Sequence, residues 1–272
     1  MNIPVDTGMD SLHKYGLQQD DVILYLGGRI DDDSLYPAEY RKYLNSKIKE
    51  LNPNKIICHT HWYAKKYYDG GVLDVSTKID MILVNYWYFT KGKLETINHA
   101  DYGGDHRSHI KPLINKNPNM IYATYQCGIC KTDSPTVGVD TSWFGEDYDF
   151  NNIKCFYFTR KYSPNDLVEG AGGGTINATD GFAVITQLVK SGFKNLNIIG
   201  FTAFGSDEDQ SCFSEYGSMN PIQVAGKKYF DLKTSENQRM EADILKNYVK
   251  QKKINNLEDY GELTRHLKKN KK

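Results

Sequence analysis

Glycines gather just ahead of a helical stretch in the second half of the chain, and this arrangement can bind an anion. Four glycines, Gly173 and Gly174 among them, occupy 170–174 and precede Thr179-Asp180-Gly181. Glycine lets the backbone approach an anionic ligand, and a helix N-terminus adds N–H groups and the positive end of a dipole. Neither the dinucleotide fingerprint nor the Walker spacing is present. The segment indicates a phosphate site of undefined class, and a flexible loop is the alternative.

The two residues that open the helix have both structural and functional interpretations. Thr179 suits an N-cap, and its hydroxyl could bind a helix amide or a ligand phosphate. Asp180 in the first turn stabilises the helix dipole, and as a carboxylate it could also act as a base. Simple capping remains the alternative for both.

Histidines and acids form two further groups that could carry chemistry. His59 and His61 follow an apolar run, and two histidines at alternate positions of one strand would point the same way and could bind metal. A polar group follows between 99 and 109, namely His99, Asp101, Asp105, His106 and His109. Packing or solvation is the alternative for both groups.

A single CxxC motif joins Cys127 and Cys130. A closed zinc site would need distant partners, because no second CxxC is present. The flanking residues also lack the helix start that a redox motif requires. We therefore expect no zinc or redox role for this pair.

Apolar runs and helical periodicities alternate along the chain. Continuous apolar runs bounded by glycine, proline or asparagine predict buried strands, and apolar residues at helical spacing predict helices. The predicted strands are 22–26, 55–59, 79–85, 119–125, 153–158 and 195–200, and the helices are 38–51, 179–191, 237–252 and 256–269. Loop or short helix is predicted for 1–20, and irregular structure for 91–118, 126–151 and 202–234.

This alternation predicts one α/β domain. We expect a Rossmann-like, doubly wound, mainly parallel sheet with helices on both faces and long loop insertions. The domain spans 1–272, with 86–150 as a loop-rich insertion and 253–272 as a basic C-terminal helix or tail. Such sheets bind ligands beyond the carboxyl ends of their strands, so the site is expected there.

Composition limits the partners and the compartment. The formal net charge is zero, so no global field draws the protein to nucleic acid or to an anionic membrane. No apolar run approaches the roughly 20 residues of a membrane span, and the N-terminus lacks a signal-peptide pattern. Five cysteines, an odd number, indicate reduced thiols. We expect a cytoplasmic protein of a bacterium or a virus-infected cell, and the oligomeric state stays open.

The segment 179–201 resembles the second sialyl motif of the sialyltransferases. The matching pieces are Thr179-Asp180-Gly181 at a helix start, the turn Gly192-Phe193-Lys194-Asn195-Leu196 and the strand end Ile199-Gly200-Phe201. Upstream, 80–85 is similar to the family's Asp-x-Val-x-x-Asn, whose Asn binds the nucleotide, and Gly27-Gly28 stands where the family has Gly-Asn-x-Gly. Glu241 resembles the Glu that closes His-x(4)-Glu, but Glu236 occupies the position of the His.

This resemblance implies a GT-A-like variant of the Rossmann-like fold and a glycosyltransferase activity. The donor would be a CMP- or UDP-sugar, with no metal and no further cofactor. The nucleotide-binding residues would be Gly27, Gly28, Asn85, Gly173, Gly174, Thr179, Gly181, Phe201, Tyr216 and Tyr229. A base would deprotonate an acceptor hydroxyl for direct displacement. The candidate bases are Asp180, Asp231, Glu236 and either His59 or His61.

The acceptor has two candidates, a glycan and a hydroxymethylated base in viral DNA. The aromatic and basic run 61–68 suits both, because sugars and flipped bases present faces that stack on aromatic rings. Two other classes of function stay open. One is a hydrolase or other enzyme on a Rossmann-like sheet that uses the histidine and acid cluster, and the other is a non-catalytic binding protein.

Overall fold

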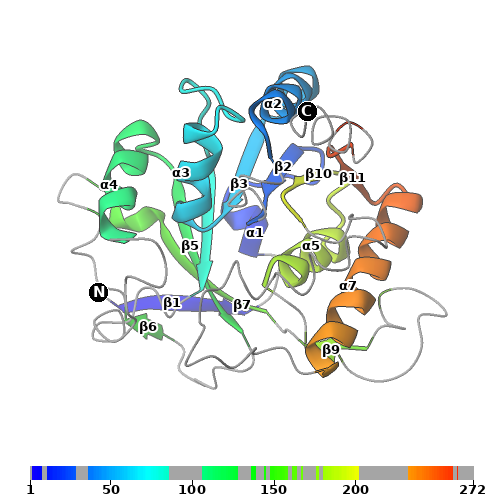
Figure 1. Ribbon diagram of the computed structural model, residues 1–272. Helices are drawn as coiled ribbons and strands as arrows, with labels where there is room; N and C mark the ends of the chain where they lie inside the picture. Colours follow the sequence, from blue (N-terminus) through cyan, green and yellow to red (C-terminus); the bar gives the residue numbers. More distant parts are fainter. Residues whose placement is uncertain are drawn as a thin grey trace.

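A parallel sheet lies between two layers of helices (Figure 1). The computed structural model describes residues 2–7, 11–28, 36–85, 106–127, 136–138, 144, 148–158, 161–163, 167, 176–177, 180–201, 232–259 and 262. Within this part of the chain the fold is Rossmann-like α/β, which confirms the predicted fold class. No helix among these residues is long and apolar enough to cross a membrane.

The main sheet of the described residues has nine strands in the order β11-β10-β2-β3-β4-β5-β7-β1-β6. The strands are β1 (Asn2–Thr7), β2 (Val22–Leu26), β3 (Lys55–His59), β4 (Met81–Asn85), β5 (Ile121–Cys127), β6 (Thr136–Gly138), β7 (Ile153–Phe158), β10 (Asn195–Ile199) and β11 (Ile254–Asn256). Every pairing from β11 to β1 is parallel, and β6 pairs antiparallel with β1. A separate antiparallel pair joins β8 (Lys161–Tyr162) to β9 (Ile176–Asn177).

Alternating side chains of the central strands bury both faces of the sheet. Leu24 and Leu26 of β2 pack in one hydrophobic layer, whereas Ile23 and Tyr25 pack in the other. This is the period of two that a strand imposes, and burial on both faces explains why β2 reads as an uninterrupted apolar run.

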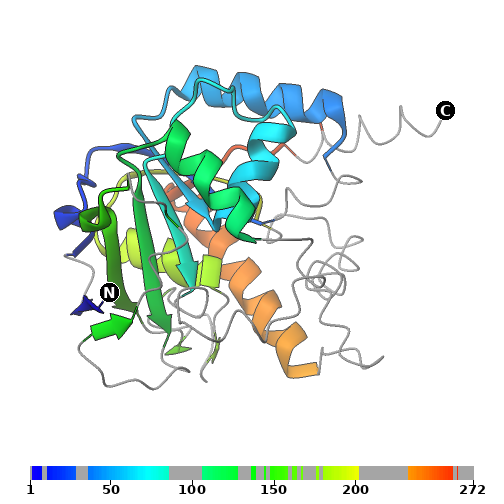
Figure 2. The ribbon, with the colours of Figure 1, turned by 90° about the vertical axis from the view of Figure 1, so that its left-hand side faces the viewer.

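The helices divide between the two faces in the same way. The first layer contains α2 (Ala38–Leu51), α3 (His61–Asp69) and α4 (His106–Lys116). The second contains α1 (Ser11–Lys14), α5 (Asp180–Lys190) and α7 (Leu232–Lys250). Figure 1 shows α3 and α4 on one side of the sheet and α5 and α7 on the other, and Figure 2 looks onto the α4 side. A short 3-10 helix, η5 (Phe150–Asn152), leads into β7.

The order of the strands reverses between β2 and β10. From β2 the chain steps outward through β3, β4, β5 and β7, with α2, α3 and α4 covering one face. It then returns through α5 on the other face to β10, which pairs with the opposite edge of β2. Such a reversal is a topological switch point, where ligands bind beyond the carboxyl ends of the strands.

Most predicted elements are confirmed, but α4, β1 and β11 differ from expectation. The stretch 91–118 was predicted to be irregular, yet α4 forms in it because Ile110, Leu113 and Ile114 bury at helical spacing despite Pro112. The predicted insertion 86–150 therefore contributes α4 and β5 to the main layers. The N-terminal segment predicted as loop or short helix contains β1, which pairs with β7.

The C-terminal prediction is wrong at its start. A helix was expected from 256, within a basic tail from 253, but 254–256 form β11 and pair in parallel with β10. The tripeptide is too short to show a strand pattern in the sequence, so only pairing with β10 reveals it. Of the rest of that prediction, 260, 261 and 263–272 lie outside the described residues.

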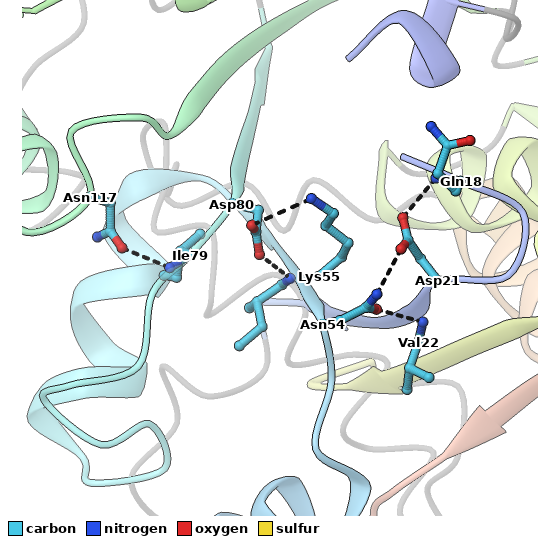
Figure 3. A network of polar contacts seen from close by, with 9 residues as sticks. Gln18, Asp21, Val22, Asn54, Lys55, Ile79, Asp80 and Asn117 are labelled. Carbon is cyan, nitrogen blue, oxygen red and sulfur yellow. Dashed lines mark hydrogen bonds and ion pairs between the residues drawn. The ribbon is translucent and has the colours of Figure 1, made fainter. Parts of the chain in front are cut away.

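Polar side chains tie together the amino ends of the central strands (Figure 3). Asn54 Nδ2 donates to Asp21 Oδ1 at 2.8 Å, and Asn54 Oδ1 accepts from the Val22 amide at 2.7 Å. Asp80 Oδ2 accepts from the Ile56 amide at 2.8 Å. Burial raises the pKa of Asp80. The first residue of the Asp-x-Val-x-x-Asn-like segment thus has a structural role at the edge remote from the carboxyl ends.

Candidate functional site

The three strands beside the switch point end within one residue of the same level. Ile199 of β10 is in register with Leu26 of β2, and Leu26 is in register with Cys58 of β3. The next residues along the chain are Gly200, Gly27 and His59. The Gly27 amide donates to the Ile199 carbonyl at 2.7 Å, which extends the β2–β10 pairing to the last turn. The turns that follow β2 and β10, at Gly27 and Gly200, therefore lie in direct contact at the carboxyl edge of the sheet.

Glycine is required at both turns because the chains approach so closely. A Cβ on Gly27 would lie 2.5 Å from the Gly200 carbonyl oxygen, and one on Gly200 would lie 2.3 Å from Tyr67 Oη. Gly200 also adopts a φ of +84°, a conformation that side-chain-bearing residues rarely adopt. The predicted residue Gly27 therefore lies at the switch point, where the fold has no space for a side chain.

Two aromatic rings cover the glycines. The Phe201 ring lies 2.9 Å from the position of a Cβ on Gly27 and 2.8 Å from that of one on Gly181, at the start of α5. The Tyr63 ring lies 2.6 Å from the position of a Cβ on Gly28. Three predicted nucleotide-binding glycines and Phe201 thus come together, although they are distant in sequence.

We call this group the switch-point cluster. Its members lie at the carboxyl ends of β2, β3 and β10 and at the starts of α3 and α5. They are Tyr25, Gly27, Gly28, His59, Tyr63, Gly181, Gly200 and Phe201.

Buried polar groups brace the two glycine turns from the α2–α3 side. Tyr67 Oη donates to the Gly27 carbonyl at 3.0 Å and lies 3.3 Å from the Ile199 carbonyl. Burial raises the pKa of Tyr67 well above its ordinary value, so its hydroxyl stays protonated and able to donate. Glu258 Oε2 accepts from the Gly200 amide at 3.0 Å, and Glu258 Oε1 accepts from the Tyr36 hydroxyl.

His59 is held on the other face of the sheet. Its Nδ1 lies 3.0 Å from the hydroxyl of Tyr25, a fully buried residue of β2. The Tyr25 ring in turn contacts Phe201, with ring centroids 5.2 Å apart. The His59 ring stacks beside Tyr63 at a centroid distance of 6.4 Å and is partly exposed. His59 therefore belongs to the switch-point cluster with a fixed ring orientation.

His61 takes a different course from His59. Thr60 has φ 67° and ψ 149°, and α3 begins at His61, so the two histidines are not alternate residues of one strand as predicted. His61 is only 1% exposed, and its Nδ1 lies 2.7 Å from the Tyr122 hydroxyl in the core of the α2–α4 side. The expected pair of histidines pointing the same way is therefore wrong.

The backbone at Thr60 is unusual in itself. A β-branched residue at this φ and ψ occupies a region that glycine alone visits readily, at a cost of about 1–3 kcal/mol. The Thr60 amide donates to the Leu83 carbonyl at 2.8 Å, and Thr60 Oγ1 accepts from the Tyr63 amide at 3.4 Å. Strain of this kind gathers at functional sites.

Other predicted site residues are placed by their backbone alone. Asn85 is the last residue of β4, Asp180 is the first residue of α5, and Glu236 lies in the first half of α7. The structure does not describe the side chains of these three residues. The remaining predicted residues lie outside the described residues: Gly173, Gly174, Thr179, Tyr216, Tyr229 and Asp231.

The alternative metal and cysteine sites find little support in the described residues. In this part of the chain no three histidine, cysteine, aspartate or glutamate side chains gather as metal ligands. His106 and His109 lie in the first turn of α4, whereas His99, Asp101 and Asp105 lie outside the described residues. Cys127 ends β5, and Cys130 also lies outside them.

Two surface hollows lie on the opposite edge of the sheet. One, of about 470 Å³, is lined by residues at the amino ends of β2, β10 and β11, including Lys194, Asn197 and Lys252. The other, of about 460 Å³, lies beside α1 and contains His13 and Lys194. The amide of Asn197 is already bonded to backbone carbonyls and to Asn255. We place the site at the switch-point cluster, where strand ends, close glycines and backbone strain coincide.

Sequence reasoning missed several members of the site and its supports. Tyr25 reads as an ordinary core residue of a strand. Tyr63 and Tyr67 belong to the aromatic run 61–68, which the sequence indicated for stacking on an acceptor but not for a place beside the glycines. Glu258 falls in a segment predicted as a helix. Gly200 could have been found from the sequence, because it precedes Phe201 at the strand end of the sialyl-like segment.

Comparison of the chain with family models, with curated proteins and with solved structures found no match. The site is therefore characterised by its own geometry and chemistry.

Proposed function

We propose that this protein is a glycosyltransferase that binds a nucleotide-sugar at the switch-point cluster. It moves the sugar to an acceptor hydroxyl by direct displacement. One observation carries the proposal: Gly27, Gly28, Gly181 and Phe201, which the sequence singled out as donor-binding residues, meet at the carboxyl ends of β2 and β10. That position is where open α/β sheets bind nucleotides.

The chemistry of the cluster suits a nucleotide. Gly27 is buried under the Phe201 ring, whereas Gly28 is partly exposed beside Tyr63 and presents backbone without a side chain to a phosphate or ribose. Gly181 lies in the first turn of α5, an 11-residue helix whose N-terminal amides and dipole favour a phosphate. Phe201 and Tyr63 supply aromatic faces for a base or a sugar.

The reaction requires charge to move onto the nucleotide. The acceptor oxygen bonds to the anomeric carbon as the bond from that carbon to the phosphate oxygen breaks. The electron pair leaves on the phosphate, where amide N–H groups stabilise it. A base takes the proton of the acceptor hydroxyl. The acceptor is a glycan or a hydroxymethylated DNA base.

A thermal-shift screen with CMP, UDP, GDP and their sugars tests the proposal. A ligand that binds only the native state stabilises it by about 2.7 kcal/mol at a concentration of 100 Kd, so Tm rises with ligand concentration. We expect one nucleotide class to give a saturable rise in Tm. An absence of any shift with all three classes would overturn the proposed function.

A glycine variant locates the binding. Gly181→Ala would place its Cβ 2.8 Å from Phe201 Cε1 and displace the ring, so we expect the apparent Kd of the active nucleotide to rise at least fivefold. Gly16→Ala is the control. Gly16 follows α1, outside the switch-point cluster, and a Cβ there meets nothing within 4 Å. Equal affinity in both variants would place the nucleotide elsewhere.

A further inference from the structure

We infer that His59 is the acid–base residue of the proposed transfer, oriented by the buried hydroxyl of Tyr25. The inference deepens the proposed function and rests on it. It assigns the base, for which the sequence offered several candidates, and it brings Tyr25 into the site as a positioning residue.

The first support is the geometry of the two side chains. His59 Nδ1 lies 3.0 Å from Tyr25 Oη. Tyr25, a residue of β2, is fully buried, and its ring packs against Phe201. A bond at Nδ1 fixes the plane of the imidazole, and the tyrosine hydroxyl can either donate to Nδ1 or accept from Nδ1–H. In the tautomer whose Nδ1–H donates to Tyr25 Oη, the lone pair of His59 resides on Nε2. Nε2 can then accept a proton as a general base.

The second support is the position of His59 in the fold. It is the last residue of β3, at the level of Gly27 and Gly200. It is partly exposed, whereas His61 is buried against Tyr122 on the opposite face of the sheet. Of the two histidines, His59 therefore lies at the level of the glycine turns and contacts Tyr25, whose ring contacts Phe201.

The third support is the strained backbone that follows. Thr60 holds φ 67° and ψ 149° between the end of β3 and the start of α3. This conformation ends the strand abruptly, so that His59 stays on the Tyr25 side while His61 enters the other layer. The backbone is thus strained at the residue that separates the two rings, and such strain persists only when the surrounding structure enforces it.

The proposed step is balanced in protons and electrons. His59 Nε2 accepts the proton of the acceptor hydroxyl as its oxygen bonds to the anomeric carbon. The bond from that carbon to the phosphate oxygen breaks, and the nucleotide leaves with the electron pair. The resulting imidazolium keeps its Nδ1–H bond to Tyr25 Oη and later returns its proton to solvent. Among the described contacts, the phenols of Tyr25 and Tyr63 are titratable groups that lie beside the ring.

The test compares His59→Asn with wild type, using the nucleotide-sugar that gives the largest thermal shift among CMP-, UDP- and GDP-sugars. Asparagine can still bond to Tyr25 but does not titrate. Turnover is measured as release of free nucleotide, and Kd by titration. We expect kcat to fall by about 10²- to 10⁴-fold, the usual contribution of a general base, with Kd within about twofold of wild type.

Further readouts separate chemistry from folding. Wild-type kcat should rise with pH through the range where imidazole loses its proton, and this limb should vanish in His59→Asn. Tyr25→Phe should lower kcat about tenfold at unchanged Kd, because only the orientation of the ring is lost. The control is His13→Asn, since His13 binds the Leu17 carbonyl beside α1 and should leave kcat and the pH profile unchanged.

Each outcome decides between the two proposals. If wild type binds and turns over the donor and His59→Asn stays within threefold of its kcat, the His59 assignment is overturned and the proposed function stands. If His59→Asn fails to fold, Tyr25→Phe with an unaltered kcat and pH limb overturns the assignment. If wild type binds no nucleotide, the proposed function itself fails.

Discussion

At the scale of single residues, Gly200 shows how closely the site is built. Its φ is +84°, and a Cβ there would lie 2.3 Å from Tyr67 Oη and 2.9 Å from the Gly27 carbonyl oxygen. Gly16 has a similar φ of +79° but open space around it. The two glycines therefore separate the cost of the backbone conformation from the cost of crowding.

We expect Gly200→Ala to destabilise the protein more than Gly16→Ala. A positive φ costs an alanine about 1–2 kcal/mol at either position. Crowding at Gly200 should add about 1–3 kcal/mol, as overpacking does elsewhere. Denaturant unfolding of both variants measures the difference. Equal losses of stability would show that Tyr67 and Gly27 move aside at no cost.

Residue types in the sequence indicated part of the site but not its partners. Gly27, Gly28, Gly181 and Phe201 were identified through the resemblance of their segments to sialyltransferase motifs. The bond between Tyr25 and His59 joins residues 34 positions apart. Only the register of β2 and β3 brings these two side chains together, and no local pattern encodes that register.

At the scale of elements, Asn117 connects the end of α4 to the start of β4. Its Oδ1 accepts from the Ile79 amide at 2.8 Å (Figure 3). Its Nδ2 donates to the Leu113 carbonyl at 3.0 Å. Asn117 is 3% exposed, so the Ile79 amide would have no solvent to replace the lost acceptor. The residue therefore holds α4 against the sheet.

Asn117→Ala should lower the free energy of unfolding by about 1–3 kcal/mol, the cost of leaving a buried donor unsatisfied. Asn119→Ala is the matched control, because Asn119 is exposed just before β5 and should change stability by less than about 0.5 kcal/mol. Urea denaturation measures both. If the two variants lose the same stability, the bond to Ile79 is not a significant support.

Elements with a strong local pattern were predictable, and those that depend on pairing were not. The strand 22–26 and the helix 38–51 match the structure. The strand is buried on both faces and the helix on one, and each kind of burial leaves a clear hydrophobic pattern in the sequence. The tripeptide of β11 carries no such pattern and forms a strand because β10 offers a free edge. The helix α4 was not predicted because Pro112 and polar residues interrupt its hydrophobic pattern. Its buried apolar face stabilises the helix in the folded protein.

At the scale of the whole molecule, Glu258 joins three distant segments. Its carboxylate accepts from the Gly200 amide at 3.0 Å and from the Tyr36 hydroxyl ahead of α2, and it follows β11. The segment after the last strand thus supports the turn that carries Phe201. Glu258 therefore supports the switch-point cluster from outside the strands that form it.

Glu258→Ala should destabilise the protein by about 1.5–3 kcal/mol, since hydrogen bonds to a charged group contribute that much. It should also weaken nucleotide binding, because the Gly200-Phe201 turn loses its support. Asp259→Ala is the control, as Asp259 is exposed and bonds only locally to the Glu262 amide among the described contacts. Thermal unfolding with and without nucleotide measures both effects. Unchanged binding in Glu258→Ala would separate this carboxylate from the site.

Sequence patterns alone predicted the alternation of strands and helices, and with it a doubly wound sheet, a fold that binds ligands at its carboxyl edge. Hydrophobic periodicity and glycine positions are local properties, so they can be read without a structure. The tertiary structure alone decided that β10 pairs with β2, that His59 meets Tyr25, and that Glu258 reaches Gly200. These contacts depend on strand order and register, which are set by burial and backbone pairing over the whole chain.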